Sequence, residues 1–167
     1  RHLVFCCMDG IEPLHTILEQ NCHLEYLEIH YLEKERWKSP FPRSTSLAHL
    51  RLRDSLDISS TMVSDLVAAT PNLHTLELQL AWASDDELSF LNTLSSLEKL
   101  ELDALGLTPG SLCRTISSTH IQSLWPHLTE LTLHNASDED AEFVLALASK
   151  LRRLSLCYCF TASKLTQ

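Results

Sequence analysis

The amino-acid sequence predicts an α/β fold in which about six or seven similar strand–helix units stack side by side. Three observations carry this prediction. A short leucine motif recurs along the chain, helix-start signals follow its copies, and 34 of the 167 residues are leucine. A chain of this length can bury one sizeable core. We therefore expect a single domain over residues 1–167, complete in itself or part of a longer array.

The recurring motif has leucine or isoleucine at its first, fourth and sixth positions. Because the fourth and sixth positions are two residues apart, they lie on the same face of a strand. One such strand cannot bury its leucines alone, so the copies must stack and share a core. A weaker copy, Leu3-x-x-Cys6-x-Met8, opens the chain. The six clear copies begin at Leu24, Leu47, Leu73, Leu97, Leu128 and Leu151.

The segments between the motif copies carry the signals of helices. Ser84–Glu87 matches a capping box, and Thr108-Pro109 matches an N-cap followed by a first-turn proline. Ser60 and Ser137 each precede apolar residues at helical spacing. Residues 33–46 lack this period, and we expect a loop there. Strands and helices in constant alternation predict a parallel sheet, concave on its open side, with helices on the convex side.

These motifs resemble those of the leucine-rich-repeat family. Leu151-x-x-Leu154-x-Leu156-x-x-Cys159 matches its cysteine-containing subtype. Two segments that lead into predicted strands resemble those in the irregular substrate-recognition arrays of F-box proteins. They are Pro71-Asn72-Leu73 and Pro126-His127-Leu128. The resemblance implies a horseshoe-shaped solenoid that binds proteins without catalysis. It also implies a cytoplasmic or nuclear ubiquitin-ligase adaptor, with cullin-ligase components contacted through flanking segments.

Two other functions stay open at this point. A ligand-sensing array of an intracellular immune receptor has similarly irregular repeats. A thiol- or metal-dependent enzyme is suggested by nine His and six Cys residues. However, Cys6-Cys7 and Cys157-x-Cys159 lie six units apart, roughly 29 Å at strand spacing, too far to share one zinc ion. We therefore predict no catalytic residue, no metal site and no cofactor.

Charge and hydropathy narrow the classes of partner. Thirteen basic and 22 acidic residues give a net charge of −9, which disfavours nucleic acid and anionic membrane surfaces. No apolar run reaches the roughly 18 residues that a membrane-spanning helix needs. The cysteine spacing does not match a small disulfide scaffold, so we expect free thiols. A protein partner is the class that remains.

The side chains between the motif leucines point to the opposite face of each strand. With the copies in register, Arg51 lies between Glu28 and Glu77, and Glu77 lies beside Glu101. Tyrosine and arginine anchor interfaces disproportionately, so we expect the hot spot around residues 26–53. An ordinary solvated surface is the alternative for each single residue. The predicted partner-binding residues of the concave face are Tyr26, Glu28, His30, Tyr31, His49, Arg51, Arg53, Glu77, Gln79, Glu101, Asp103 and His134.

Overall fold

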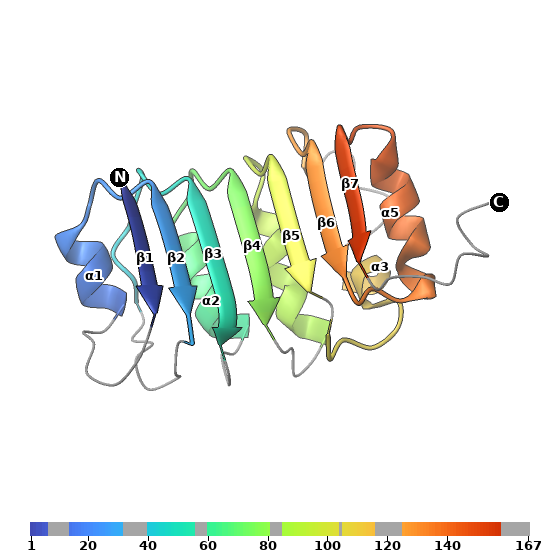
Figure 1. Ribbon diagram of the computed structural model, residues 1–167, viewed down its shortest axis with the longest axis horizontal. Helices are drawn as coiled ribbons and strands as arrows, with labels where there is room; N and C mark the ends of the chain where they lie inside the picture. Colours follow the sequence, from blue (N-terminus) through green and yellow to red (C-terminus); the bar gives the residue numbers. More distant parts are fainter. Residues whose placement is uncertain are drawn as a thin grey trace.

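A single parallel sheet of seven strands, in which strand order follows chain order, forms the front of the molecule (Figure 1). The computed structural model describes residues 1–6, 14–31, 40–55, 60–80, 85–103, 105–115 and 125–157. Each strand therefore pairs with the strands of the units before and after it. The strands are β1 (His2–Cys6), β2 (Tyr26–His30), β3 (His49–Ser55), β4 (Thr75–Leu80), β5 (Lys99–Asp103), β6 (Glu130–His134) and β7 (Arg153–Cys157).

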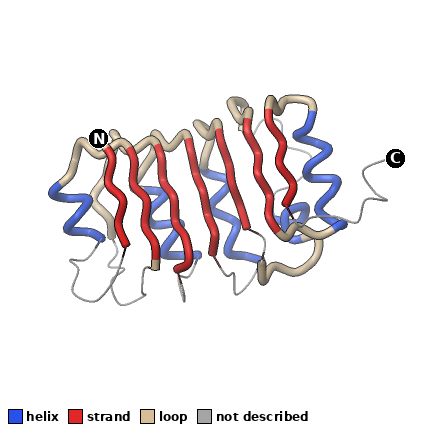
Figure 2. The backbone as a smooth tube through the Cα atoms, viewed as in Figure 1, coloured by secondary structure: helices blue, strands red, loops and turns tan. Residues whose placement is uncertain are grey.

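The helices all lie behind the sheet and leave its other face open (Figures 1 and 2). This arrangement confirms the predicted α/β class, the parallel sheet and the placement of helices on one side. The helices are α1 (Leu14–Gln20), α2 (Ser60–Ala68), α3 (Ser111–Thr115) and α5 (Ala141–Ala148), with 3-10 helices η2 (Asp85–Thr93) and η3 (Asp138–Asp140). We call the side of the sheet away from the helices the open face.

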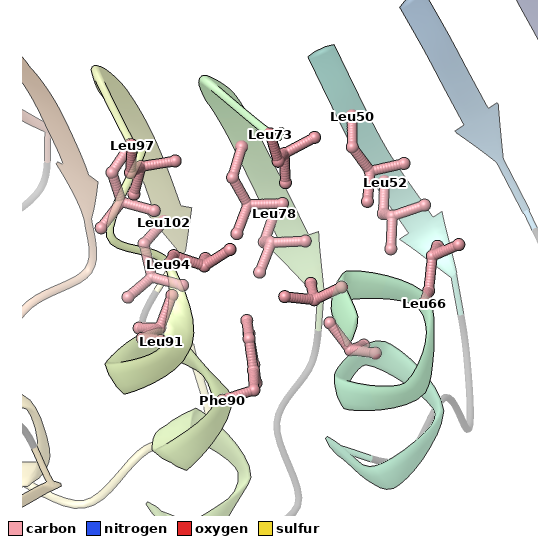
Figure 3. Close-up of a cluster of buried hydrophobic side chains, with 14 of the residues drawn as sticks. Leu50, Leu52, Leu66, Leu73, Leu78, Phe90, Leu91, Leu94, Leu97 and Leu102 are labelled. Carbon is pink, nitrogen blue, oxygen red and sulfur yellow. The ribbon is translucent and has the colours of Figure 1, made fainter. Parts of the chain in front are cut away.

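The core lies between the sheet and the helices. From β2 to β6, the fourth and sixth motif positions are at most 1 % exposed, as the pattern predicts. Leucines of α2 and η2 pack against these strand residues from behind the sheet. Figure 3 shows this with Leu91 of η2 on the helix side of the strand residues Leu50 and Leu78. Each buried leucine contributes about 1.5–3 kcal/mol by leaving water, so the repeated leucines are the main source of stability.

The entry to each strand repeats the same backbone hydrogen bonds. The first motif leucine closes a tight turn, as where Leu73 N donates to Thr70 O over 3.2 Å. The second motif position donates to the same position one unit earlier, as where His74 N donates to Ala48 O over 2.8 Å. This ladder runs through Glu25, Ala48, His74, Glu98, Thr129 and Arg152. Similar sequences therefore fold into units that are equivalent down to individual backbone bonds.

Two helical segments differ from their predicted form. Around residues 85–93 the helix is of the 3-10 type. Leu88, Leu91 and Leu94 recur at every third residue and are all buried, which suits a helix of three residues per turn. The expected N-cap at Thr108 is wrong, because α3 begins only at Ser111. Ser111 N donates to Thr108 O across a turn in which Gly110 takes a φ of 76°, a conformation that favours glycine.

The predicted register of the first motif copy is also wrong. Leu3 pairs with Leu27, the fourth motif position of the next unit, and Val4 pairs with Glu28. The copy is therefore displaced by three residues from the predicted Leu3-x-x-Cys6-x-Met8. A shift by an odd number exchanges the two faces of a strand, so Val4 rather than Cys7 takes the central outward position. One leucine alone could not specify this register.

Several predictions concern residues outside the described part of the chain. They include the capping residue Ser84, the first half of the loop at 33–46, and the side chains of Cys7 and Cys159. Within the described part, Cys22, Cys113 and Cys157 are free thiols. The described helices include none with the length and apolar character required to traverse a lipid bilayer.

Candidate functional site: the polar open face

The open face carries three columns of polar side chains in the predicted register. Strand pairing sets His49 beside Tyr26, Arg51 beside Glu28, and Arg53 beside His30. The same columns continue through Glu77, Gln79, Glu101, Asp103 and His134 on the following strands. All the predicted binding residues except Tyr31 therefore belong to strands and alternate with buried leucines. Tyr31 follows β2 directly and lies at the rim of this face.

Arg51 lies between two carboxylates, as the register predicts. Its Nη1 donates to Glu28 Oε1 over 3.4 Å, and its Nε lies 2.6 Å from Glu77 Oε2. The second contact is an ion pair whose N–H is not aligned for a hydrogen bond. Both carboxylates are almost buried, whereas Arg51 is about a quarter exposed. The three residues form the centre of the charged network.

The Glu28 carboxylate also contacts two other side chains of β2. Its Oε2 accepts a hydrogen bond from the Tyr26 hydroxyl over 2.7 Å, and its Oε1 lies 2.9 Å from His30 Nε2. Burial alone would raise the pKa of Glu28, but these hydrogen bonds and the charge of Arg51 outweigh burial and lower it. Burial and the hydrogen bond to Glu28 raise the pKa of Tyr26. Glu28 thus stays ionised and Tyr26 stays protonated at neutral pH.

Glu77 receives three cations. Besides Arg51, it contacts Arg53 Nη2 at 3.9 Å and forms a short ion pair with Lys99. Burial alone would lower the pKa of Arg51, but the charges of Glu77 and Glu28 outweigh it and raise the pKa. The predicted like-charge contact between Glu77 and its register neighbour Glu101 is therefore compensated on the Glu77 side, where Lys99 is one of the three cations.

Glu101 and Asp103 of β5 have different surroundings. Glu101 Oε1 accepts a hydrogen bond from Gln79 over 3.0 Å and lies 3.5 Å from His134 Nε2. Asp103 accepts one from the Asn135 amide over 2.8 Å. Neutral amides and an imidazole, rather than guanidinium groups, therefore surround these carboxylates in the contacts described here.

Aromatic rings gather at the β1–β3 end of the open face. His2 stacks on Tyr26 with ring centroids 4.6 Å apart, and His49 lies 6.1 Å from Tyr26 on the other side. Tyr31 lies 6.2 Å from His30 and is 55 % exposed. The hot spot predicted for this region thus contains both rings and guanidinium groups.

Tyr31 takes a φ of 55°, in the left-handed region that bulky residues avoid. The equivalent residue after β6 is Asn135, with a φ of 56°, and asparagine tolerates this conformation. The left-handed conformation costs about 1–2 kcal/mol for a residue other than glycine. The backbone of Tyr31 is nevertheless fixed, because Tyr31 N donates to Arg53 O over 3.1 Å.

Some residues of the open face were not among those predicted to bind. Lys99 stands in the column of Tyr26 and His49, so the register alone could have included it. His2 and Val4 were missed because the first motif copy was placed three residues too late. Asn135 has no motif signal, since it follows β6 as Tyr31 follows β2. These four residues extend the candidate surface to β1 and enlarge it at β5 and β6.

The structure describes some of the His and Cys residues on which a metal- or thiol-dependent activity would rest. No three His, Cys, Asp or Glu side chains of the described ranges come together as metal ligands. His134 and Cys157 are register neighbours, and His134 lies against Glu101. Trp125 is fully buried, and its indole N–H donates to Leu91 O over 3.1 Å.

Two hollows in the described part are lined by none of the predicted binding residues. One lies beside β1 and is lined by Arg1, His2, Leu3 and residues 20–24. Another lies against α2 and includes Phe41 and Asp65. Comparison with known proteins finds no matching family model and no similar curated protein.

Proposed function

We propose that the chain is a leucine-rich-repeat array that binds a protein partner on its open face, without catalysis. The observation that carries this proposal is the continuous surface formed by alternating side chains of five successive strands, β2 to β6. Its rings and charges converge from segments more than 20 residues apart in sequence. Such a surface matches the size and mixed chemistry of protein interfaces better than those of a small-molecule pocket.

The repeat architecture is supported by three independent regularities. The motif leucines are buried at equivalent positions, every strand pairs in parallel with its predecessor, and the entry turns repeat the same hydrogen bonds. Wider helices behind a sheet of closely spaced strands favour an arc with the sheet inside. On this proposal the open face is the concave side of a horseshoe.

The ion pairs make the open face ready for binding. Arg51, Glu28 and Glu77 hold one another in place, so their side chains lose little additional freedom when a partner binds. Ordering such long side chains costs about 0.5–1.5 kcal/mol each at an interface. A network that is ordered in advance lowers this cost and favours specific recognition.

The direct test is protein capture by the chain and two matched variants. The double variant Arg53→Glu with His134→Arg alters the open face. The control variant Leu145→Glu adds a charge at an exposed position of α5, behind the sheet. We expect both to fold, as judged by circular dichroism and thermal unfolding. Capture of specific proteins should be lost in the double variant and kept in Leu145→Glu. Equal capture by both variants would contradict binding through the open face.

The more specific role of a ubiquitin-ligase adaptor rests on the sequence resemblance alone. It requires flanking segments of the full-length gene product to contact a cullin ligase. Immunoprecipitation of that full-length product should then recover cullin-ligase components. Their absence would remove the ligase role and leave the binding role intact. A nucleotide-binding domain beside the repeats would instead favour an immune receptor.

A further inference from the structure

The charges of the open face lie at different depths. The side chains of Glu28, Glu77 and Glu101 are only 10–13 % exposed. The cations over Glu28 and Glu77, namely Arg51, Arg53 and Lys99, are 25–33 % exposed. These six side chains carry equal numbers of positive and negative charges, so together they are formally neutral. A partner that approaches Glu28 and Glu77 nevertheless meets guanidinium and ammonium groups before it meets these carboxylates.

This exposed positive charge occurs in an acidic chain, at its least acidic end. Residues 1–55 contain seven Lys and Arg and eight Asp and Glu, with five His. Residues 56–167 contain six Lys and Arg and 14 Asp and Glu. Repulsion of an acidic partner by the chain as a whole is therefore weakest over β1–β3. Exposed charges at an interface act mainly on orientation and specificity.

The same end of the face offers exposed apolar surface. Tyr31 and Val4 are both more than half exposed, and Val4 takes the central outward position beside Glu28. Tyr31 also keeps an unfavourable backbone conformation that an asparagine accepts at the equivalent position after β6. Its backbone N–H donates to Arg53 O, which fixes Tyr31 at the carboxyl end of β2 beside the strand that carries Arg53. Strain of this kind is often retained at binding sites.

We propose that an acidic segment of the protein partner binds over β1–β3, at the corner formed by His30, Tyr31 and Arg53. The carboxylates of the segment bind the guanidinium groups of Arg53 and Arg51, and an aromatic or aliphatic side chain packs on Tyr31. This inference rests on the proposed function and gives the partner its chemistry. At this corner a basic segment would instead have to reach Glu28 or Glu77, which are more enclosed than the cations over them.

The test begins with selection of short random peptides, displayed on phage, against the immobilised full chain. We expect the enriched peptides to contain Asp or Glu beside Phe, Tyr or Leu. A synthetic fluorescent peptide from the enriched set then gives affinities by fluorescence anisotropy at low and high salt. Its affinity should fall at high salt, because the contacts with Arg51 and Arg53 are charged.

Four variants locate the binding site. Tyr31→Asn and Arg53→Gln should each weaken the peptide by about tenfold or more. Arg153→Gln removes an exposed cation from the same face at β7, and Leu145→Ala removes an exposed leucine from α5. Both should bind within about twofold of the unmodified chain. Tyr31→Asn should keep or raise the midpoint of thermal unfolding, because it relieves backbone strain while it removes the ring.

The outcomes separate this inference from the proposed function. Enriched peptides that are neutral or basic, yet lose affinity in Arg53→Gln, would overturn the acidic partner and leave binding through the open face standing. Equal weakening by Arg153→Gln and Arg53→Gln would overturn the placement at this corner. A lower thermal midpoint in Tyr31→Asn would mean that the ring stabilises the fold, and would overturn its role as a contact. No enrichment would overturn the acidic segment alone, whereas binding unaffected by any variant of the open face would overturn both proposals.

Discussion

Arg51 links two carboxylates that are too enclosed to be left without a cation. Exposed ion pairs contribute about 0–1 kcal/mol, and removal of one partner of a fully buried pair costs about 3–5 kcal/mol. Because Arg51 is a quarter exposed and its partners nearly buried, Arg51→Gln should lower the free energy of unfolding by about 1–3 kcal/mol. Urea unfolding measures this, with Arg153→Gln at the exposed pair with Glu130 as a control that should change little. Equal stability of the two variants would contradict a structural role for Arg51.

The lowered pKa of Glu28 predicts how stability depends on acid. A carboxyl whose pKa is lower in the folded chain stabilises it fully above the ordinary glutamate value, about 4.3, and loses this contribution as pH falls through the folded value. The stability advantage of the unmodified chain over Glu28→Gln should therefore be constant near neutral pH and shrink below about pH 4.3. Urea unfolding at several pH values checks this. In Tyr26→Phe, which lacks one of the hydrogen bonds that lower the pKa of Glu28, the loss should be smaller and should be complete at a higher pH. An advantage that grows in acid would contradict the prediction.

Among the elements, α3 and η3 are joined through a buried carboxylate. Asp140 is 2 % exposed and accepts hydrogen bonds from Leu112 N over 3.0 Å and from the Ser137 hydroxyl over 2.6 Å. Ser137 Oγ in turn accepts one from Gly110 N. The carboxylate belongs to the following unit and satisfies a backbone N–H donor at the start of α3. Ser137 and Asp140 therefore stabilise α3 as well as the helix that they precede in the chain.

Loss of this carboxylate should separate the two elements. Asp140→Ala leaves buried donors without acceptors and should lower the free energy of unfolding by about 2–4 kcal/mol. Asp140→Asn keeps one acceptor oxygen and should lose less. Glu139→Gln, at the exposed neighbouring position, should be close to neutral. Urea unfolding of the three variants gives the order, and a neutral Asp140→Ala would show that α3 does not depend on the contact.

At the scale of the whole molecule, the core depends on a neighbour on each side of a strand. Leu76 in the middle of the sheet is fully buried, whereas Leu154, at the equivalent position of the last strand, is 41 % exposed. Leu76→Ala should therefore lower the free energy of unfolding by about 2–5 kcal/mol, and Leu154→Ala by clearly less. Thermal or urea unfolding measures both. Similar losses at the two positions would mean that stacking of the units does not determine burial.

Much of the fold followed from local regularity. Two-residue alternation assigned the motif leucines to the core, and the regular succession of strand and helix predicted the parallel sheet. The same alternation placed Arg51 between Glu28 and Glu77 correctly. It failed at β1, where one leucine was too little to specify register, and at Thr108, where a turn and a helix start share the same residues. The polar bond that ties Asp140 to α3 had no signal, because its partners come from separate units.

The sequence by itself determined which side chains face the core and which face outward, because alternation along a strand is a property of the local backbone. Only the tertiary structure decided how deep each outward charge lies and where Tyr31 stands. Those features arise when long side chains reach across strands whose residues are more than 20 positions apart in the chain, so no local pattern records them. The chemistry of the proposed partner is inferred from how exposed these charges are, whereas the repeat pattern alone already predicted the surface on which the partner binds.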